Sequence, residues 1–177
     1  MARIVVLGAG IGGMSAAYEL RGTLGPDPAI TVIGEGDLFS FTPSNPWVAV
    51  GWRKPGDVQL PVAAHLAKKK IAFEGVGAEK VEPETNRVLL RDGRHIEYDY
   101  LVIATGPRLA FDEIPGLGPE GGFTQSVCTT AHANTAWDAY QAFLKHPGPI
   151  VVGAAAGASC FGPAYEFAMI LDADLRK

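Results

Sequence analysis

The stretch IVVLGAGIGGM at residues 4–14 decides the fold. Its first four residues form a continuous apolar run, which is typical of a buried strand. A glycine-rich turn follows, and beyond it apolar residues recur at helical spacing as far as Leu24. Pro26 ends this helix, and a second apolar run covers residues 30–33. The segment therefore predicts the strand–turn–helix–strand unit of a nucleotide-binding α/β domain.

The glycines of this turn have distinct expected roles. In a Gly-x-Gly-x-x-Gly pattern, Gly8 permits the tight turn, Gly10 lets the backbone approach a pyrophosphate, and Gly13 lets the helix pack closely on the strand. Gly12 lies in the same turn. The N–H groups and the dipole at the start of the helix favour phosphate charge. The alternative is a glycine-rich packing turn without a ligand.

An acidic residue at the end of the second strand normally binds ribose hydroxyls in such a unit. Here the strand end reads IGEGD at residues 33–37, and Glu35 is the best candidate. It stands one place later than the pattern requires. A solvated loop carboxylate is the alternative interpretation of Glu35.

The rest of the chain predicts a further series of elements. An aromatic, proline-rich segment at residues 39–52 has no clean period and predicts an ordered loop. The Asp92-Gly93 pair, next to an alternating segment, predicts a hairpin. Further signals indicate helices at 61–70, 131–145 and 163–176, strands at 98–105 and 149–152, a loop-rich stretch at 106–130 and a second glycine-rich turn after residue 152.

Composition bounds the class of protein. The chain has 177 residues, 47% of them hydrophobic, and a formal net charge of -4. Mild acidity without a basic run argues against nucleic-acid binding. Two cysteines exclude a disulfide scaffold, and together with four histidines they show no metal-ligand spacing. Glycines in the first apolar run argue against a signal peptide, and prolines and glycines break the longest uncharged stretch, 147–165, so no transmembrane helix is expected.

These patterns predict an α/β chain with one nucleotide-binding domain at residues 1–147 and the start of a second at 148–177. The second unit has a strand, a glycine turn and one helix, and a parallel sheet needs a returning strand. We therefore interpret the sequence as most of one nucleotide-binding domain and the first piece of another.

Four stretches resemble a known family. The segment YDYLVIATG at 98–106 resembles the Ala-Thr-Gly segment of flavoproteins with two dinucleotide-binding domains. Together with FTPSNPW at 41–47, SVCTTAH at 126–132 and GASCFGPAYE at 157–166, it resembles sulfide:quinone oxidoreductase. The resemblance covers essentially the whole chain. It implies a Rossmann-like FAD-binding domain with an inserted β-meander, followed by the first strand–turn–helix of a second dinucleotide-binding-like domain.

The resemblance also implies a cofactor and its contacts. FAD would lie on the first glycine turn, and the backbone of Ala104, Thr105 and Gly106 would pass near the flavin nucleotide. The loop that contains Pro43 and Asn45 would form a wall beside the flavin, since aromatic and proline-rich loops exclude water. A loop that only covers the core is the alternative for this segment.

Both cysteines fall in the stretches that carry the resemblance. Cys160 precedes an expected helix start, where the positive end of the helix favours a thiolate. The resemblance makes Cys160 one member of a redox pair, whose second member lies beyond residue 177 in the family. It makes Cys128 an accessory sulfur-handling residue. Ordinary burial as small hydrophobic residues is the alternative for both.

Two further residues have the chemistry to move protons near sulfur. His132 follows Cys128 by four residues, so on a helix the two would share a face, and histidine exchanges protons near neutral pH. Glu166 follows Cys160 by six residues and would serve as a proton acceptor. A histidine without a chemical role at a helix start and an ordinary helix carboxylate are equally good interpretations.

The expected substrates and partners follow from the resemblance. The family oxidises sulfide to sulfur or polysulfide and passes electrons through FAD to membrane quinone, so peripheral membrane contact is expected through the family's segments beyond residue 177. Homo-oligomerisation is expected through the sheet edges or apolar faces that those segments would cover. Three alternatives stay open: the flavin subunit of flavocytochrome c sulfide dehydrogenase, an NADH:quinone oxidoreductase, and a folded, inert fragment without flavin. The second glycine turn, GAAAGA at 153–158, lacks two fingerprint glycines, which argues against NADH use.

Overall fold

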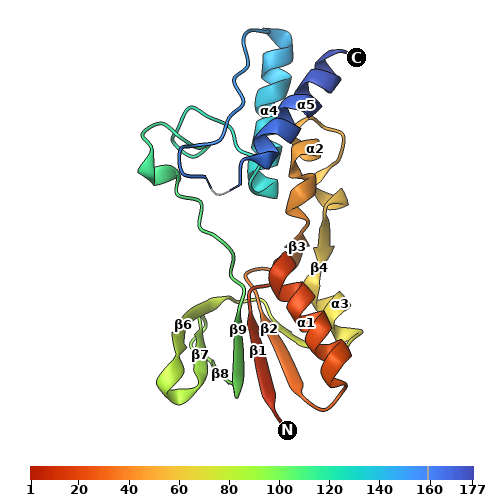
Figure 1. Ribbon diagram of the computed structural model, residues 1–177, viewed down its shortest axis with the longest axis vertical. Coiled ribbons are helices and arrows are strands. Elements are labelled where there is room, and N and C mark those ends of the chain that lie inside the picture. Colours follow the sequence, from red (N-terminus) through yellow and green to blue (C-terminus); the bar gives the residue numbers. More distant parts are fainter. Residues whose placement is uncertain (159) are drawn as a thin grey trace. The chain divides into compact units, whose positions relative to one another are not determined.

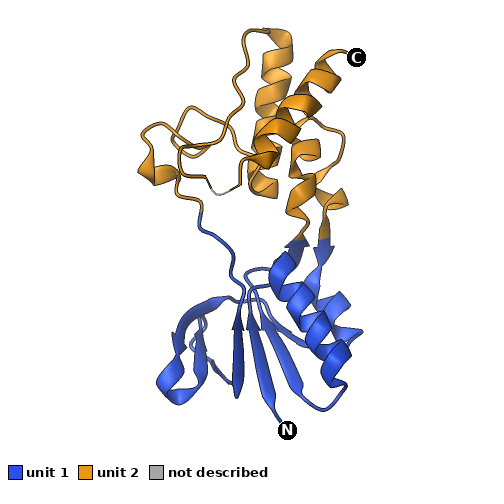
Figure 2. Ribbon diagram, viewed as in Figure 1, with its two compact units in different colours: residues 1–39, 60–108 blue, residues 40–59, 109–177 orange. Residues whose placement is uncertain are grey.

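The computed structural model describes residues 1–158 and 160–177 (Figure 1). The chain forms two compact units: unit 1 comprises residues 1–39 and 60–108, and unit 2 comprises residues 40–59 and 109–177 (Figure 2). Each unit has hydrophobic clusters of its own. These units are groups of packed residues. The division into nucleotide-binding domains at residue 147 stays a prediction.

Unit 1 is built on a parallel sheet with strand order β5-β2-β1-β9. Its strands are β1 (Arg3–Leu7), β2 (Ala29–Ile33), β5 (Ala72–Glu74) and β9 (Tyr100–Ile103). Ile4 lies opposite Ile30 on one side and Tyr100 on the other. The expected Rossmann-like α/β class is confirmed, because the two apolar runs 4–7 and 30–33 pair as parallel neighbours.

One face of this sheet is covered by α1 (Ile11–Leu24) and α3 (Val62–Ala67). Met14 and Ala17 on α1 and Leu66 on α3 are buried against strand residues such as Val6 and Val32. Burying a side chain as large as that of Met14 or Leu66 contributes about 1.5–3 kcal/mol, which holds the layers together. The helix predicted after the glycine turn is confirmed. The helix expected at 61–70 is present but shorter: it ends at Ala67, and residues 68–70 form a turn.

The other face is covered by a three-stranded antiparallel sheet in the order β6-β7-β8. Its strands are β6 (Ala78–Glu82), β7 (Arg87–Leu90) and β8 (His95–Glu97), with a short 3-10 helix, η3 (Pro83–Thr85), between the first two. Val88 and Leu90 pack on Val5. At the predicted hairpin turn, Gly93 has φ +85°. The inserted β-meander is therefore confirmed.

Unit 2 consists mainly of helices and loops. Its elements are η1 (Thr42–Ser44), α2 (Asn45–Ala49), η2 (Pro55–Asp57), η4 (Phe111–Glu113), α4 (Thr130–Lys145) and α5 (Gly162–Leu175). Val48 and Ala49 of α2 are buried against Ala133 of α4, and Phe167 of α5 joins the same cluster. The three helices therefore share one core. The helices expected at 131–145 and 163–176 are confirmed.

The prediction of a loop at residues 39–52 was wrong. The segment contains the end of β3 (Leu38–Ser40), which pairs with β4 (Gln59–Pro61), then η1 and the helix α2. Pro46 stands in the first turn of α2, where its missing N–H costs nothing. The helix is too short to show a period, and it is held by burial of Val48 and Ala49.

The strand expected at residues 149–152 is not formed in the part of the chain that the structure describes. A strand needs a neighbour to satisfy its backbone groups. No described strand pairs with residues 149–152, and the side chain of Val151 is 95% exposed. Apolar composition alone therefore gave a wrong prediction. Among the described residues, no helix is both long and apolar enough to cross a membrane.

Candidate functional site

The parallel sheet of unit 1 reverses its strand order around β1. The chain passes from β1 to β2 on one side, and β9 lies on the other side. In open α/β sheets, ligands bind outside the carboxyl ends of the strands at such a switch point. The glycine turn at residues 8–13 follows β1 at this position (Figure 1). The topology therefore places the turn where a nucleotide site is expected.

Gly8 and Gly13 are glycines because nothing larger fits. Gly8 has φ +114°, and a Cβ atom there would lie 2.2 Å from the carbonyl oxygen of Ala104. A Cβ atom on Gly13 would lie 1.8 Å from the carbonyl oxygen of Gly8. The Gly8 N–H donates to the carbonyl oxygen of Ile33 at 2.7 Å. The turn is thus packed tightly against the ends of both neighbouring strands.

Gly10 differs, because a Cβ atom there would meet nothing within 4 Å. Gly10 is the N-cap of α1, and no side chain caps the helix. The first N–H groups of a helix have no partners within it. They are available for an anion, and the helix dipole favours one. Gly12 is exposed in the same turn. A tight turn with open space above its N–H groups fits a pyrophosphate.

The end of β2 lies against this turn. Gly34 is buried, and a Cβ atom there would lie 2.6 Å from the Cβ of Ala9. The next residue, Glu35, extends into solvent with 72% of its side chain exposed, and it forms an ion pair with Arg91. Sequence reasoning missed Arg91, because the pair joins residues 56 positions apart. The structure therefore puts the expected carboxylate of Glu35 beside the glycine turn at residues 8–13, which we call the glycine cradle, and pairs it with Arg91.

The Ala-Thr-Gly segment follows β9 on the other side of the turn. The Ala104 N–H donates to the carbonyl oxygen of Leu7 at 2.7 Å and so extends the pairing with β1. Thr105 and Gly106 are exposed, and Gly106 has φ +74°. Gly8, Gly34 and Ala104 therefore surround one point at the carboxyl end of the sheet.

The remaining predicted residues lie in unit 2. Asn45, at the start of α2, is completely buried, and its Oδ1 accepts a hydrogen bond of 3.0 Å from the hydroxyl of Thr130 at the start of α4. Its Nδ2 is buried and has no hydrogen-bond partner among the described residues. Pro43 is exposed in η1. A buried amide donor without a partner costs free energy of desolvation, so Asn45 is a costly polar residue in the core of unit 2.

Cys128 and His132 do not share a helix face, contrary to expectation. The helix α4 begins at Thr130 with Thr129 as its N-cap, so Cys128 precedes it. The thiol of Cys128 is free and exposed. His132 packs its ring against Phe111 at a centroid distance of 5.6 Å. Its Nε2 lies 3.7 Å from Glu120, and its Nδ1 is buried without a partner among the described residues.

Cys160 and Glu166 lie near the start of α5. Cys160 is free and exposed, two residues before the helix begins, and no side chain caps that helix. Glu166 is exposed in the second turn. Both thiols are therefore accessible to a small solute.

Comparison with known proteins identifies the family. The family model for pyridine nucleotide-disulphide oxidoreductases matches residues 2–158. This chain belongs to that family. The sulfide-quinone reductase of Aquifex aeolicus is 47% identical over 174 residues, which are 98% of this chain and 39% of that protein. The mitochondrial sulfide:quinone oxidoreductase of Dictyostelium discoideum is 27% identical over 99% of this chain and 39% of its own length.

A solved structure agrees with these relatives. The crystal structure of sulfide:quinone oxidoreductase from Aquifex aeolicus matches with a TM-score of 0.92 at 45% identity, over 99% of this chain and 40% of that chain. The resemblance to sulfide:quinone oxidoreductases is therefore confirmed, and this chain spans about 40% of their length. Membership of the pyridine nucleotide-disulphide oxidoreductase family implies flavin binding.

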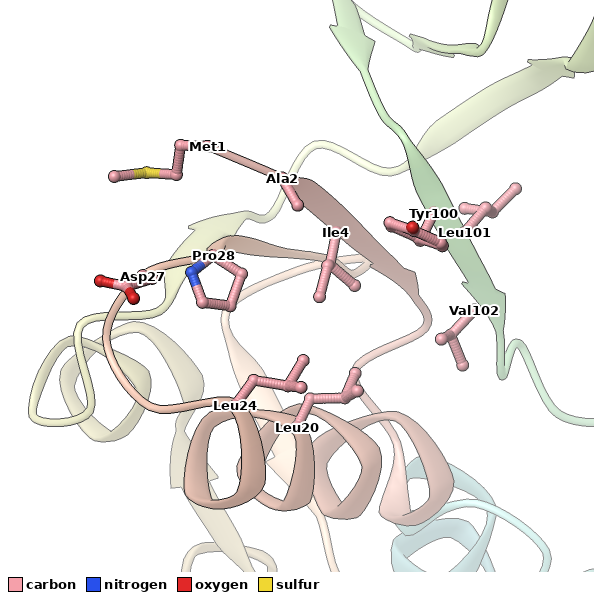
Figure 3. A pocket seen from close by; sticks show the side chains of 10 residues that line it. All are labelled: Met1, Ala2, Ile4, Leu20, Leu24, Asp27, Pro28, Tyr100, Leu101 and Val102. Atoms are coloured by element: carbon pink, nitrogen blue, oxygen red, sulfur yellow. The ribbon is translucent and has the colours of Figure 1, made fainter.

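A hollow in unit 1 lies away from the expected nucleotide site. It has a volume of about 870 Å³ and lies at the amino ends of β1 and β9, opposite the glycine turn (Figure 3). Leu20 and Leu24 of α1 face Ile4 across it, and Tyr100 and Val102 of β9 line its other side. Its lining is mainly apolar and its one charged side chain, Asp27, is acidic, so it offers little to the negatively charged nucleotide that this family binds.

Proposed function

We propose that this chain forms the FAD-binding part of a sulfide:quinone oxidoreductase. The observation that carries the proposal is the glycine cradle at the switch point, in a chain 47% identical over 98% of its length to a sulfide-quinone reductase. The electrons lost by sulfide equal those gained by quinone in the overall reaction. Hydrosulfide gives up two electrons and a proton as it becomes sulfur, and quinone takes up two electrons and two protons to become quinol.

The residues of unit 1 hold the cofactor in this proposal. The N–H groups of Gly10, Gly12 and Gly13 bind the pyrophosphate, and Gly8 lets the turn close on β9. Glu35 accepts a hydrogen bond from a ribose hydroxyl. The backbone at Ala104–Gly106 passes beside the flavin nucleotide. When bound, FAD supplies the two-electron acceptor that is later reoxidised by quinone.

The residues of unit 2 handle sulfur in this proposal. Hydrosulfide attacks a disulfide that contains Cys160, which forms a persulfide on one cysteine and releases the other as a thiolate. The second cysteine of that pair is supplied at a family position beyond residue 177. Cys128 takes part in handling the sulfur, and either His132 or Glu166 accepts the single proton that hydrosulfide loses. Pro43 and Asn45 belong to the segment that shields the flavin from water. Quinone is dissolved in lipid, so the enzyme works at a membrane surface.

The proposal is tested by the visible absorption spectrum of the purified chain, before and after addition of sulfide without oxygen. A flavin spectrum that bleaches with sulfide supports the FAD site and shows that sulfide electrons reach the flavin without the second cysteine of the proposed pair. A flavin spectrum that sulfide leaves unchanged supports the FAD site and shows that this chain does not oxidise sulfide by itself. A chain that takes up no FAD, even when FAD is added during refolding, contradicts the proposal.

Single-cysteine variants provide the matched control. Cys160→Ser is expected to reduce sulfide-dependent bleaching at least tenfold in the longer enzyme, while Cys128→Ser reduces it less, since the proposal gives Cys160 the bond-forming role. Both thiols are exposed, so both variants should fold and keep the flavin spectrum. Equal bleaching rates for Cys160→Ser and the unmodified enzyme would remove Cys160 from the mechanism.

A further inference from the structure

Arg91 forms an ion pair with one oxygen of the Glu35 carboxylate, next to the glycine cradle. The guanidinium Nη1 of Arg91 donates to Oε1 of Glu35. The other carboxylate oxygen, Oε2, has no hydrogen-bond donor among the described residues. Glu35 therefore keeps one free acceptor while its other oxygen is held. It stands one residue after Gly34, which touches the glycine turn at Ala9.

The backbones on both sides of this contact are fixed. Arg91 donates its N–H to the carbonyl oxygen of Gly77 at 3.1 Å, and a Cβ atom on Gly77 would lie 3.3 Å from the Arg91 Nε. The arginine side chain thus lies over a glycine that leaves room for it. Glu35 forms a β-bridge with Val76. Arg91 and Glu35 are therefore attached to adjacent residues of one segment, 76–77.

The hairpin that carries Arg91 is anchored at a second point. Arg94, on the other side of the turn, donates to Glu74 and Asp92, both at 2.7 Å. Glu74 is the last residue of β5, and its carbonyl oxygen accepts the N–H of Gly34. The tip of the β7–β8 hairpin is thus tied to the same strand ends that flank the cradle.

We propose that Arg91 is a positioning residue for the nucleotide: it holds the Glu35 carboxylate so that Oε2 accepts a hydrogen bond from the adenosine ribose. This rests on the proposed FAD site. A glutamate with 72% of its side chain exposed samples several rotamers, and ordering it on binding costs free energy. An arginine that orders it beforehand reduces that cost. The inserted antiparallel sheet thereby contributes to cofactor affinity without touching the flavin.

A competing arrangement makes the opposite prediction. If Arg91 occupied the acceptor that the ribose needs, the ion pair would have to break on binding, and removing Arg91 would tighten it. The free Oε2 argues for the first arrangement, since a carboxylate accepts hydrogen bonds at both oxygens. The sign of the change in affinity therefore decides between the two.

The experiment uses the full chain freed of flavin and titrated with FAD, followed by flavin fluorescence, and with ADP, followed by calorimetry. ADP carries the adenosine ribose and the pyrophosphate without the flavin. Arg91→Gln is expected to weaken both ligands about threefold to tenfold, the cost of ordering one long side chain. Arg91→Lys should recover part of this loss, because an ammonium group still pairs with Oε1.

Two controls separate positioning from a general effect of charge. Arg87 lies on β7, the strand that leads to the turn with Arg91, and pairs with Glu82 at 3.8 Å, so Arg87→Gln removes a half-buried arginine without touching Glu35. It should leave both affinities unchanged. In a Glu35→Ala background, Arg91→Gln should have no further effect on either ligand.

The outcomes are distinguishable. Unmodified chain that binds neither FAD nor ADP contradicts the proposed function. Unmodified chain that binds both, with Arg91→Gln equal or tighter, overturns the positioning role alone. A loss that persists in the Glu35→Ala background also overturns it, because Arg91 would then act on the ligand directly. A loss in Arg91→Gln that disappears in that background supports it.

Discussion

Gly8 and Gly10 stand two residues apart in one turn, yet substitution at each should have a different consequence. Alanine at Gly8 requires φ +114° and places a methyl group 2.2 Å from the Ala104 oxygen. We expect Gly8→Ala to lower the free energy of unfolding of the flavin-free chain by about 3 kcal/mol or more. Urea denaturation measures this change.

Gly10→Ala is the matched control, because its methyl group would enter open space. It should cost about 1 kcal/mol or less in the flavin-free chain, the effect of alanine at an N-cap. It should nevertheless weaken FAD binding, since the methyl group occupies the space that the pyrophosphate needs. Equal losses of stability in the two variants would contradict the division of roles within the turn.

Tyr140 is a second position where one side chain has a measurable signature. Burial, together with its 2.8 Å hydrogen bond to Asp174, raises the pKa of Tyr140 to about 12. The neutral phenol is thus favoured by folding. Its contribution to stability is complete below the ordinary tyrosine pKa of about 10 and is lost as the pH rises towards 12. In an alkaline titration followed by tyrosinate absorbance, one of the five tyrosines should ionise late.

Tyr140→Phe should remove this late step and leave the earlier steps unchanged. The variant keeps the ring that packs against Phe143 at 6.3 Å and loses only the hydroxyl. If the late step persisted in Tyr140→Phe, another tyrosine would be responsible. The assignment to the contact with Asp174 would then fail.

At the scale of elements, Asp174 connects three parts of unit 2. Its carboxylate near the end of α5 accepts hydrogen bonds from Trp52 Nε1 at 2.7 Å and from the Tyr140 hydroxyl on α4. Lys177 adds a third donor at 3.2 Å and lies over the Trp52 ring. Asp174→Ala leaves two partly buried donors unpaired and should cost about 1–3 kcal/mol for each.

The same contacts predict a dependence on acid. The hydrogen bond from Trp52, followed by those from Tyr140 and Lys177, holds the pKa of Asp174 below its ordinary value. Its contribution to stability is present above the unfolded pKa of about 3.9 and is lost as the pH falls through the lower folded value. Asp174→Asn should flatten the acid limb of the plot of Tm against pH. Asp172→Asn, on the same helix but exposed and paired with Arg176, should flatten it much less.

The elements also show what the sequence could reveal. The strands and helix of residues 3–33 were predictable, because Ile4–Leu7 and Ile30–Ile33 bury entire apolar runs and the glycines stand where tight contacts require them. The helix α2 was not predictable, because tertiary burial rather than periodicity holds it. The partners of strands and of charged side chains could not be predicted from the sequence either. Among the described residues, 149–152 lack a partner strand, and Glu35 pairs with Arg91 in the turn between β7 and β8.

At the scale of the whole molecule, the chain has two units with separate cores and an open sheet edge in the first. Among the described residues, β9 pairs with β1 on one side only and forms an edge of the parallel sheet. Its four residues, Tyr100–Ile103, carry no charge, and Tyr100 and Ile103 are 64% and 65% exposed. Natural edge strands are usually protected by charge, proline or a covering element. This one is open and apolar.

We therefore expect the chain to associate with itself through β9 as its concentration rises, and Ile103→Lys to prevent this. A lysine on the edge would have to be buried beside the partner's strand, which opposes pairing, while the exposed site tolerates it in the monomer. Light scattering across a concentration series measures the change in mass.

Val151→Lys is the matched control, because it also replaces an exposed aliphatic side chain with lysine, but outside any strand. If both lysine variants dissolved the association equally, general hydrophobicity would be its cause. If the unmodified chain stayed monomeric at high concentration, the edge would be protected by something other than charge. Association lost only in Ile103→Lys would assign it to pairing at β9.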